Sequence, residues 1–334
     1  MLAVPLLWWG LGLREVQVTA EPIPTAVAED APIEPNWARS QPLPAPLASA
    51  AVASVGVDVY LVGGQAGAGV SDTVYVYETR QRTWRTAAPK PTAVSEATAA
   101  QLLGIYVMGG RTATGQPTDV VELYSPTEDR WRTVARLPEP VAGGVALSDG
   151  RAIYLFGGWN GADYTDSAYS YDPATDAWSA LPPLPEPRGY ATGGVIAGQF
   201  YVVGGENEAG VLASCAVYDA ENRVWGDCAA MSLARRGAGA AVVLGKLYVL
   251  GGTAEASYGE VYDPQKGLWQ IINLPDLAAE GGEPVGWEAL AVTNVEARIY
   301  LLGGRVGEGQ FSAANLVYAP SVYQTFIPAT LGGE

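Results

Sequence analysis

The sequence predicts an all-β protein folded as a six-bladed β-propeller, with four antiparallel strands in each blade. Three observations predict it. An apolar segment that ends in Gly-Gly occurs six times, a Tyr and a Trp seven residues apart follow five of the six copies, and the second glycines lie 46, 48, 47, 47 and 52 residues apart. A fixed period of this size with four short strands per repeat is typical of propeller blades.

The Gly-Gly segments share one pattern: an aliphatic residue or Phe, then Tyr, two apolar residues and two glycines. They are VYLVGG (59–64), IYVMGG (105–110), IYLFGG (153–158), FYVVGG (200–205), LYVLGG (247–252) and IYLLGG (299–304). Four consecutive apolar residues predict a short strand that is buried on both faces. The glycines end each strand because glycine reaches positive φ without a steric penalty from Cβ.

The Tyr–Trp segments predict the two outer strands of each blade as a hairpin. They are 76–84, 123–131, 170–178, 217–225 and 261–269. Pro126, Pro173 and Pro264 occupy one turn position, each after Ser or Asp, as type I turns prefer. A stretch of small residues such as GAGAAVVLG (237–245) precedes the next Gly-Gly segment and is predicted to be innermost, where the blades crowd the axis.

The spacing of the aromatic residues also predicts how the ring closes. The sixth repeat contains Tyr318, but Thr325 stands where its Trp is expected. Trp37 precedes Gly63 by 26 residues, which is the usual distance from a Trp to the next Gly-Gly segment. We therefore expect residues 34–41 to supply the outer strand of blade six, with Phe326 as the alternative occupant.

These motifs resemble the kelch repeat family over about residues 37–320. The resemblance implies the propeller fold. It also implies a range of roles, since kelch propellers serve as protein-binding modules, as carbohydrate-related domains and occasionally as enzyme scaffolds. The motifs are specific for the fold and carry little information on the ligand.

Charge and composition exclude several classes of function. The net charge is −16 with only three lysines and no basic run, which argues against a nucleic-acid partner. The absence of histidine excludes Ser-His-Asp and Cys-His catalysis and any His-ligated metal centre. We expect no cofactor and no bound metal.

The two ends of the chain differ in composition from the repeats. Residues 1–18 contain an uncharged apolar stretch that predicts a signal-like or truncated membrane-anchor segment. Residues 19–33 are rich in Pro, Ala and acidic residues and predict a linker. The propeller is assigned to residues 34–320, and residues 321–334 form a C-terminal tail of unassigned role. We expect a secreted or cell-surface monomer. Whether its N-terminus tethers it to a membrane stays open.

Cys215 and Cys228 flank the hairpin of blade four. Tyr218 and Trp225 of the same hairpin are expected to face each other, and the same register places the two cysteines opposite each other. The sequence therefore predicts a disulfide, in agreement with an oxidising compartment. The alternative is a pair of buried free thiols.

The binding surface is predicted on the face that carries the loops after Gly-Gly and the links that enter the innermost strands. The kelch resemblance implies an Arg that opens the innermost strand, and only Arg188 and Arg235 or Arg236 match it here. Blades one to three have Leu47, Ala93 or Val141 instead, so a full ring of arginines is absent. Further candidate ligand-binding residues on this face are Arg111, Trp159, Tyr164, Trp287 and Arg305.

From these residues the sequence favours a non-catalytic module that binds a protein or glycan. Arginines would pair with carboxylates and aromatic side chains would supply apolar contact. Two alternatives stay open: a carbohydrate-active enzyme that uses Asp or Glu at the channel mouth, and a structural spacer without a specific ligand. An enzyme would need two acidic groups about 5–10 Å apart in a pocket.

Overall fold

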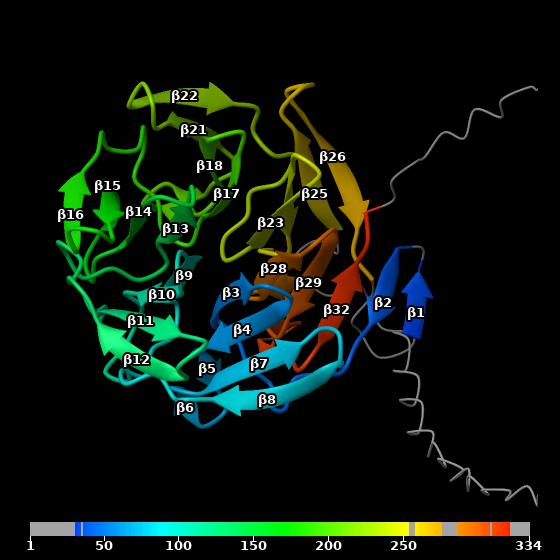
Figure 1. The fold of residues 1–334 in the computed structure, drawn as a ribbon. Helices are drawn as coiled ribbons and strands as arrows, with labels where there is room; N and C mark the ends of the chain where they lie inside the picture. Colours follow the sequence, from blue (N-terminus) through cyan, green and yellow to red (C-terminus); the bar gives the residue numbers. More distant parts are fainter. Residues whose placement is uncertain (1–30, 35, 254–257, 276–285, 308, 321–334) are drawn as a thin grey trace, which may run out of the picture.

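The computed structural model describes residues 31–34, 36–253, 258–275, 286–307 and 309–320. Six antiparallel sheets are arranged as blades around a central axis, in the order of the chain (Figure 1). The strands that carry small residues lie innermost and contact one another around the axis. The fold class predicted from the repeats is therefore confirmed.

Blades one to three each contain four strands, ordered from the axis outward along the chain. Blade one is β3 (Ala51–Val55), β4 (Asp58–Val62), β7 (Val74–Glu78) and β8 (Thr83–Ala87); blade two is β9 (Thr98–Gln101), β10 (Ile105–Met108), β11 (Val121–Ser125) and β12 (Arg130–Thr133). Blade three is β13 (Val145–Ser148), β14 (Ile153–Trp159), β15 (Tyr164–Asp172) and β16 (Ala177–Ala180).

Blades four to six follow the same plan. Blade four is β17 (Thr192–Ile196), β18 (Gln199–Val203), β21 (Cys215–Asp219) and β22 (Val224–Cys228); blade five is β23 (Gly239–Val243), β24 (Lys246–Leu250), β25 (Tyr258–Asp263) and β26 (Leu268–Asn273). Blade six is β28 (Ala291–Val295), β29 (Arg298–Leu302), β32 (Asn315–Tyr318), β2 (Trp37–Arg39) and β1 (Ala31–Glu34).

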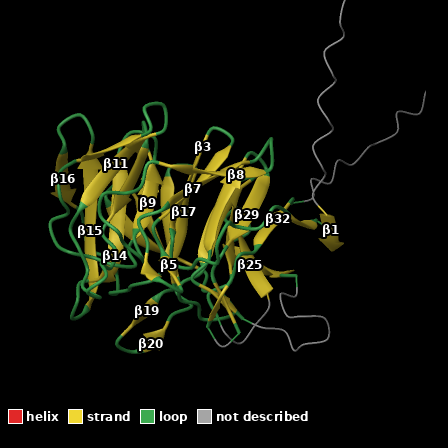
Figure 2. Cartoon of the chain, turned by 90° about the horizontal axis from the view of Figure 1, so that it is seen from below, coloured by secondary structure: helices red, strands yellow, loops and turns green. Residues whose placement is uncertain are grey.

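Short strands form in the loops after Gly-Gly and in the link that enters blade six. They are β5 (Gln65–Ala66) with β6 (Gly69–Val70), β19 (Glu206–Asn207) with β20 (Gly210–Val211), and β27 (Trp287–Glu288) with β30 (Arg305–Val306) and β31 (Gln310–Phe311). The β19–β20 hairpin extends beyond the edge of the blades on this side of the ring (Figure 2).

The N-terminal strand closes the ring, as the aromatic spacing predicts. β2 pairs antiparallel with β32, and Trp37 stands opposite Tyr318 as the other Trp residues stand opposite their Tyr partners. β1 then pairs with the outer side of β2, so blade six has a fifth strand that begins before residue 34, the predicted propeller boundary. The alternative occupant, Phe326, lies outside the described residues.

A ring of equivalent hydrogen bonds connects all six blades at their outer strands. Each outer-strand Trp donates its indole N–H to a backbone carbonyl of the preceding blade. The pairs are Trp84 to Gln41, Trp131 to Ala88, Trp178 to Ala135, Trp225 to Pro182, Trp269 to Ala229, and Trp37 to Asn273. Trp37, far from the others in sequence, thus completes the same pattern at 3.2 Å.

The apolar core is divided among the seams between neighbouring blades. Six clusters of buried residues are present, and each joins side chains of two adjacent blades. The cluster between blades one and two, for example, packs Tyr60 and Val76 against Ile105 and Tyr124. Packing between blades, more than within them, therefore holds the ring together.

The Gly-Gly pairs let each blade approach the next one closely. Gly109 has φ +63°, and a Cβ atom added there would lie 2.2 Å from the carbonyl oxygen of Val141 in the following link. The next amide, of Gly110, donates to that same oxygen at 2.8 Å. Glycine is required here by both its backbone conformation and the lack of space.

The predicted N-terminal segments at residues 1–18 and most of 19–33, and the tail at 321–334, lie outside the described residues. Within the described part of the chain, no helix is long and apolar enough to cross a membrane.

Candidate functional site

The loop face surrounds one mouth of the central channel, and six backbone hydrogen bonds encircle that mouth. The residues that form this ring occupy equivalent positions and all have positive φ: Ser49, Glu96, Gly143, Tyr190, Gly237 and Ala289. Each amide donates to the carbonyl of the preceding member, and Ser49 donates to Ala289, at 2.7–2.9 Å. The ring satisfies the backbone at the axis and leaves side chains free to project around the mouth.

A cavity of about 140 Å³ lies at this mouth, lined mainly by the backbone ring and the small residues that follow it. The channel continues between the innermost strands, where Ala, Gly, Val and Thr line a further 270 Å³. The small residues leave the lumen open.

One polar network at the mouth joins blades two and four. Arg111 donates from Nε to Glu96 Oε2 and from Nη2 to the hydroxyl of Tyr190, both at 2.6 Å. The Tyr190 hydroxyl in turn donates to Glu96 at 3.0 Å. Its ring lies over Gly143, where an added Cβ would be 2.6 Å from the ring. Tyr190 thus reaches across blade three, and glycine at 143 makes room for it.

A second network lies beside the first. Tyr164 donates its hydroxyl to Glu206 Oε1 at 2.6 Å, and Arg236 forms an ion pair with Glu206 Oε2 at 3.0 Å. The guanidinium of Arg236 lies 5.0 Å from the centre of the Tyr190 ring, which connects the two networks. The arrangement gathers side chains from the links and loops of several blades at one place.

The environment of the two tyrosines keeps both hydroxyls protonated at neutral pH. Burial, followed by the nearby Glu96 carboxylate, raises the pKa of Tyr190 to about 12. Burial, followed by the hydrogen bond to Glu206, raises the pKa of Tyr164 to about 12. Both side chains therefore act as neutral hydrogen-bond donors.

Trp159 and Arg305 are the remaining two candidate ligand-binding residues that the structure places around the mouth. The guanidinium of Arg111 lies 4.1 Å from the centre of the Trp159 ring. Arg305 donates to Gln65 at 2.8 Å across the joint between blades six and one, and lies 5.4 Å from the Phe311 ring. The predicted residues Arg111, Trp159, Tyr164, Arg236 and Arg305 are thus brought to the loop face.

The other three candidates, Arg188, Arg235 and Trp287, are buried in the seams between blades, with exposures of 2%, 1% and 2%. All three perform the same structural task. Each donates a side-chain N–H to the carbonyl of the first glycine of a Gly-Gly pair, at 3.0, 2.7 and 2.7 Å. A ligand on the surface has no access to them, so they are not part of the binding surface.

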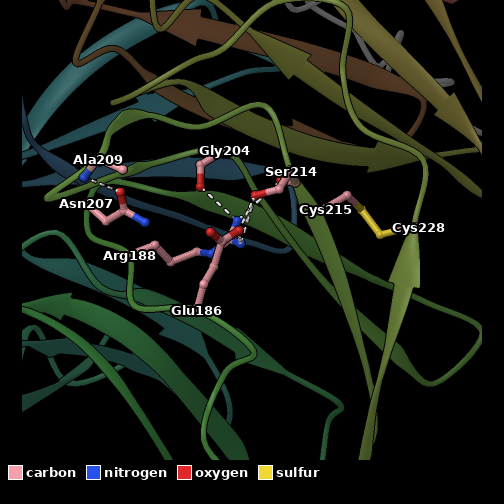
Figure 3. A network of polar contacts seen from close by, with 8 residues as sticks. All are labelled: Glu186, Arg188, Gly204, Asn207, Ala209, Ser214, Cys215 and Cys228. Carbon is pink, nitrogen blue, oxygen red and sulfur yellow. Dashed lines mark hydrogen bonds and ion pairs between the residues drawn. A yellow bond between two sulfur atoms is a disulfide. The ribbon is translucent and has the colours of Figure 1, made fainter.

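Arg188 shows how the two terminal nitrogens of such a guanidinium group are held. It donates to Gly204, to Glu186 at 2.6 Å and to the hydroxyl of Ser214 at 3.0 Å (Figure 3). The disulfide between Cys215 and Cys228 lies beside this network on the outer hairpin, with a Cα–Cα distance of 5.2 Å. The two cysteines face each other in the predicted register.

Sequence reasoning missed Glu96 and Tyr190. A signal for both was present, because positions 49, 96, 143, 190 and 237 recur every 47 residues and are glycine in two blades. Glycine at a repeated turn position indicates positive φ. A Glu or Tyr at that position must adopt a backbone conformation that residues other than glycine disfavour, which indicates a functional reason for its side chain. Glu206 directly follows a Gly-Gly pair, as Arg111 and Trp159 do. Among the described residues, no group of three or more His, Cys, Asp or Glu could hold a metal ion.

A closed six-bladed ring of kelch-type repeats, with polar side chains around one channel mouth, defines a propeller of the kelch class. The KLHDC2/KLHL20/DRC7 Kelch-repeats domain matches residues 49–252 and 105–304, and the chain belongs to this family. The solved structure of YjhT is similar, with a TM-score of 0.74 and 17% identity, over 85% of this chain and 98% of that one. At this identity the likeness concerns the fold. Comparison with curated proteins gives no match.

Proposed function

We propose that the protein is a non-catalytic binding module that recognises a protein partner through the loop face around the channel mouth. The observation that carries the proposal is the connected network of Arg111, Trp159, Tyr164, Tyr190 and Arg236 at the centre of that face. Arg, Trp and Tyr are the residue types that dominate the energetic centres of protein–protein interfaces.

The exposure of these groups suits recognition. The side chains of Arg111 and Arg236 are 31% and 46% exposed, so each can form further hydrogen bonds without unfolding its surroundings. Their ion pairs and aromatic contacts restrict the side chains in advance. A partner would then lose less conformational entropy in ordering them.

The balance of charge favours a polar protein surface over a strongly charged ligand. Glu96 and Glu206 accompany the two arginines, and each carboxylate is held in an ion pair. The Trp159 ring is covered on one side by the Arg111 guanidinium, which leaves less open aromatic surface for stacking on a sugar. A glycan ligand is therefore the second candidate, supported by the aromatic rings and hydroxyls at the mouth.

We further propose that the protein works outside the cell or on its surface. The Cys215–Cys228 disulfide supports this location, because structural disulfides persist in oxidising compartments. The apolar N-terminal segment predicted from the sequence points the same way.

A binding screen of the full chain against surface-protein extracts and a glycan panel tests the proposal. An Arg111→Ala/Arg236→Ala variant should lose the ligand, whereas an Arg151→Ala/Arg223→Ala variant should retain it. The control removes the same charge from exposed turns on the opposite face of the ring.

Equal binding by both variants would contradict a site at the mouth. A glycan retained by the native protein and lost by the first variant would keep the site but replace the partner class. Chemical conversion of a panel sugar would contradict a non-catalytic role.

A further inference from the structure

A second cavity lies on the face opposite the loop face, at the seam where blade one meets blade six. Its volume is about 300 Å³. It is formed by turns that connect strands on this side of the ring: the β3–β4 and β7–β8 turns of blade one and the β28–β29 turn of blade six. We call it the closure pocket, after the seam at which the ring closes.

Three arginines and one glutamate supply the charged groups of the closure pocket. Arg80 and Arg82 come from the β7–β8 turn, Glu296 comes from the β28–β29 turn, and Arg298 is the first residue of β29. This local excess of positive charge contrasts with a net charge of −16 for the whole chain. Positive charge concentrated in one concave site of an acidic protein indicates an anionic ligand.

Two of these guanidinium groups are available to a ligand. Arg80 and Arg298 are exposed, and none of the ion pairs found among the described residues involves either of them. Two acidic groups belong to the blade-one side: Glu78 pairs with Arg85 at 3.2 Å, and Asp58 interacts electrostatically with Arg80.

The equivalent turns of blades two and three carry the opposite charge. Asp129 and Asp176 stand where blade one has Arg82, and all three have positive φ. Each aspartate accepts a backbone N–H from the preceding blade, at 2.8 Å in both cases. The charge at this seam position therefore differs between blades: it is an acid in blades two and three, an arginine in blade one and in blade four (Arg223), and a glycine in blade five (Gly267).

We propose that the closure pocket binds a phosphate or sulfate group carried by a small molecule. Planar guanidinium groups match tetrahedral oxyanions with paired N–H donors. The cavity would hold roughly ten waters at about 30 Å³ each, which exceeds the oxyanion and leaves room for part of its carrier. Glu296 and the Thr79 hydroxyl then face the uncharged part, where they accept hydrogen bonds from carrier hydroxyl groups.

Occupation of the closure pocket links two blades that are distant in sequence. Arg80 belongs to blade one and Arg298 to blade six, so an oxyanion between them stabilises the closed ring by mass action. This inference is independent of the function proposed for the loop face.

Calorimetric titration of the full chain tests the proposal directly. The probes are inorganic phosphate, inorganic sulfate and glucose 6-phosphate, with glucose as the uncharged control, at matched ionic strength. We expect the three anions to bind and glucose not to bind. The Arg298→Gln variant should bind about tenfold more weakly or worse, because a charged hydrogen-bond donor is lost.

The matched control is Arg151→Gln, which removes an exposed arginine from the corresponding turn of blade three. It should bind as the native protein does. Arg80→Gln is a second test variant on the other side of the seam, so the result does not depend on the folding of one variant. Phosphate should also raise the Tm of the native protein and of the control by several degrees, and that of the two test variants by less.

Absence of anion binding would overturn the proposal, as would equal binding by Arg298→Gln, Arg80→Gln and Arg151→Gln. Tighter binding of glucose 6-phosphate than of inorganic phosphate supports a carrier-borne group. Equal binding of the two supports the oxyanion site and identifies free phosphate or sulfate as sufficient.

Discussion

Arg235 and Arg236 are neighbours in the chain, but they lie in two different regions of the molecule. Arg235 is buried in a seam between blades, where it donates to Gly251 and pairs with Glu260, which is itself fully buried. Arg236 is half-exposed at the channel mouth, where it pairs with Glu206 and lies against the Tyr190 ring. The same residue type therefore serves stability in the seam and, in the function proposed above, recognition at the mouth.

The difference teaches that the role of a residue in these links depends on whether its side chain is buried between two blades or exposed at the channel mouth. The chain passes from the seam to the mouth within one residue, because the link turns at the backbone ring. Substitutions in the seam should act on folding, and substitutions at the mouth should act on binding. The following predictions test that division.

The largest expected effect is that of Arg235→Ala. It leaves the buried Glu260 carboxylate without its cation, which should destabilise the fold by about 3–5 kcal/mol. Urea or guanidinium denaturation followed by Trp fluorescence measures it. A midpoint close to that of the native protein would show that the seam arginine is dispensable.

The seam between blades five and six depends on Trp37. Trp37→Ala removes a buried indole and its hydrogen bond to Asn273, and should cost about 3–5 kcal/mol. Trp37→Phe keeps an aromatic ring and should cost less. An unchanged Tm for Trp37→Ala would contradict closure of the ring by the N-terminal strand.

The disulfide connects the two outer strands of blade four. Replacing Cys215 and Cys228 by Ser removes a cross-link that spans 13 residues, for which about 3 kcal/mol is expected. Thermal unfolding of the variant, beside that of the chemically reduced native protein, measures the loss. Native stability in both samples would mean that packing alone holds this hairpin.

Arg236→Ala should change the free energy of unfolding by less than about 1 kcal/mol, because its ion pair is partly exposed to water. The same substitution should weaken ligand binding. This pairing of effects is the reverse of that expected for Arg235→Ala. Comparable destabilisation by both substitutions would erase the distinction between seam and mouth.

Alkaline pH should lower the stability of the folded protein slightly at first, and more strongly as the pH rises. The pKa of Tyr190 is raised to about 12 in the folded protein, above its ordinary value near 10. The folded state therefore keeps the proton where the unfolded state loses it, and stability present below pH 10 is lost as the pH rises toward 12. Melting curves from pH 9 upward should show a shallower decline for Tyr190→Phe. An identical slope would assign the decline to the seam tyrosines, such as Tyr124 and Tyr171.

Much of the fold could be predicted because the repeats carry local information. The period, the Gly-Gly segments and the facing of Tyr218 by Trp225 follow from strand periodicity and turn chemistry, which depend on neighbouring residues. The site was harder to predict. Arg188 and Trp287 look like surface residues in a polar link, and only the approach of the next blade buries them.

By itself, the sequence determined the number of blades, the closing role of Trp37 and the pairing of Cys215 with Cys228, since each is written in the spacing of residues along one strand or one repeat. Only the tertiary structure decided which arginines face water and that Tyr190 reaches Glu96 across blade three. It also placed Arg80 and Arg298 in the lining of one pocket. These pairs are separated by 94 residues or more in the chain, and they meet because the ring brings different blades to a common axis and joins the last blade to the first.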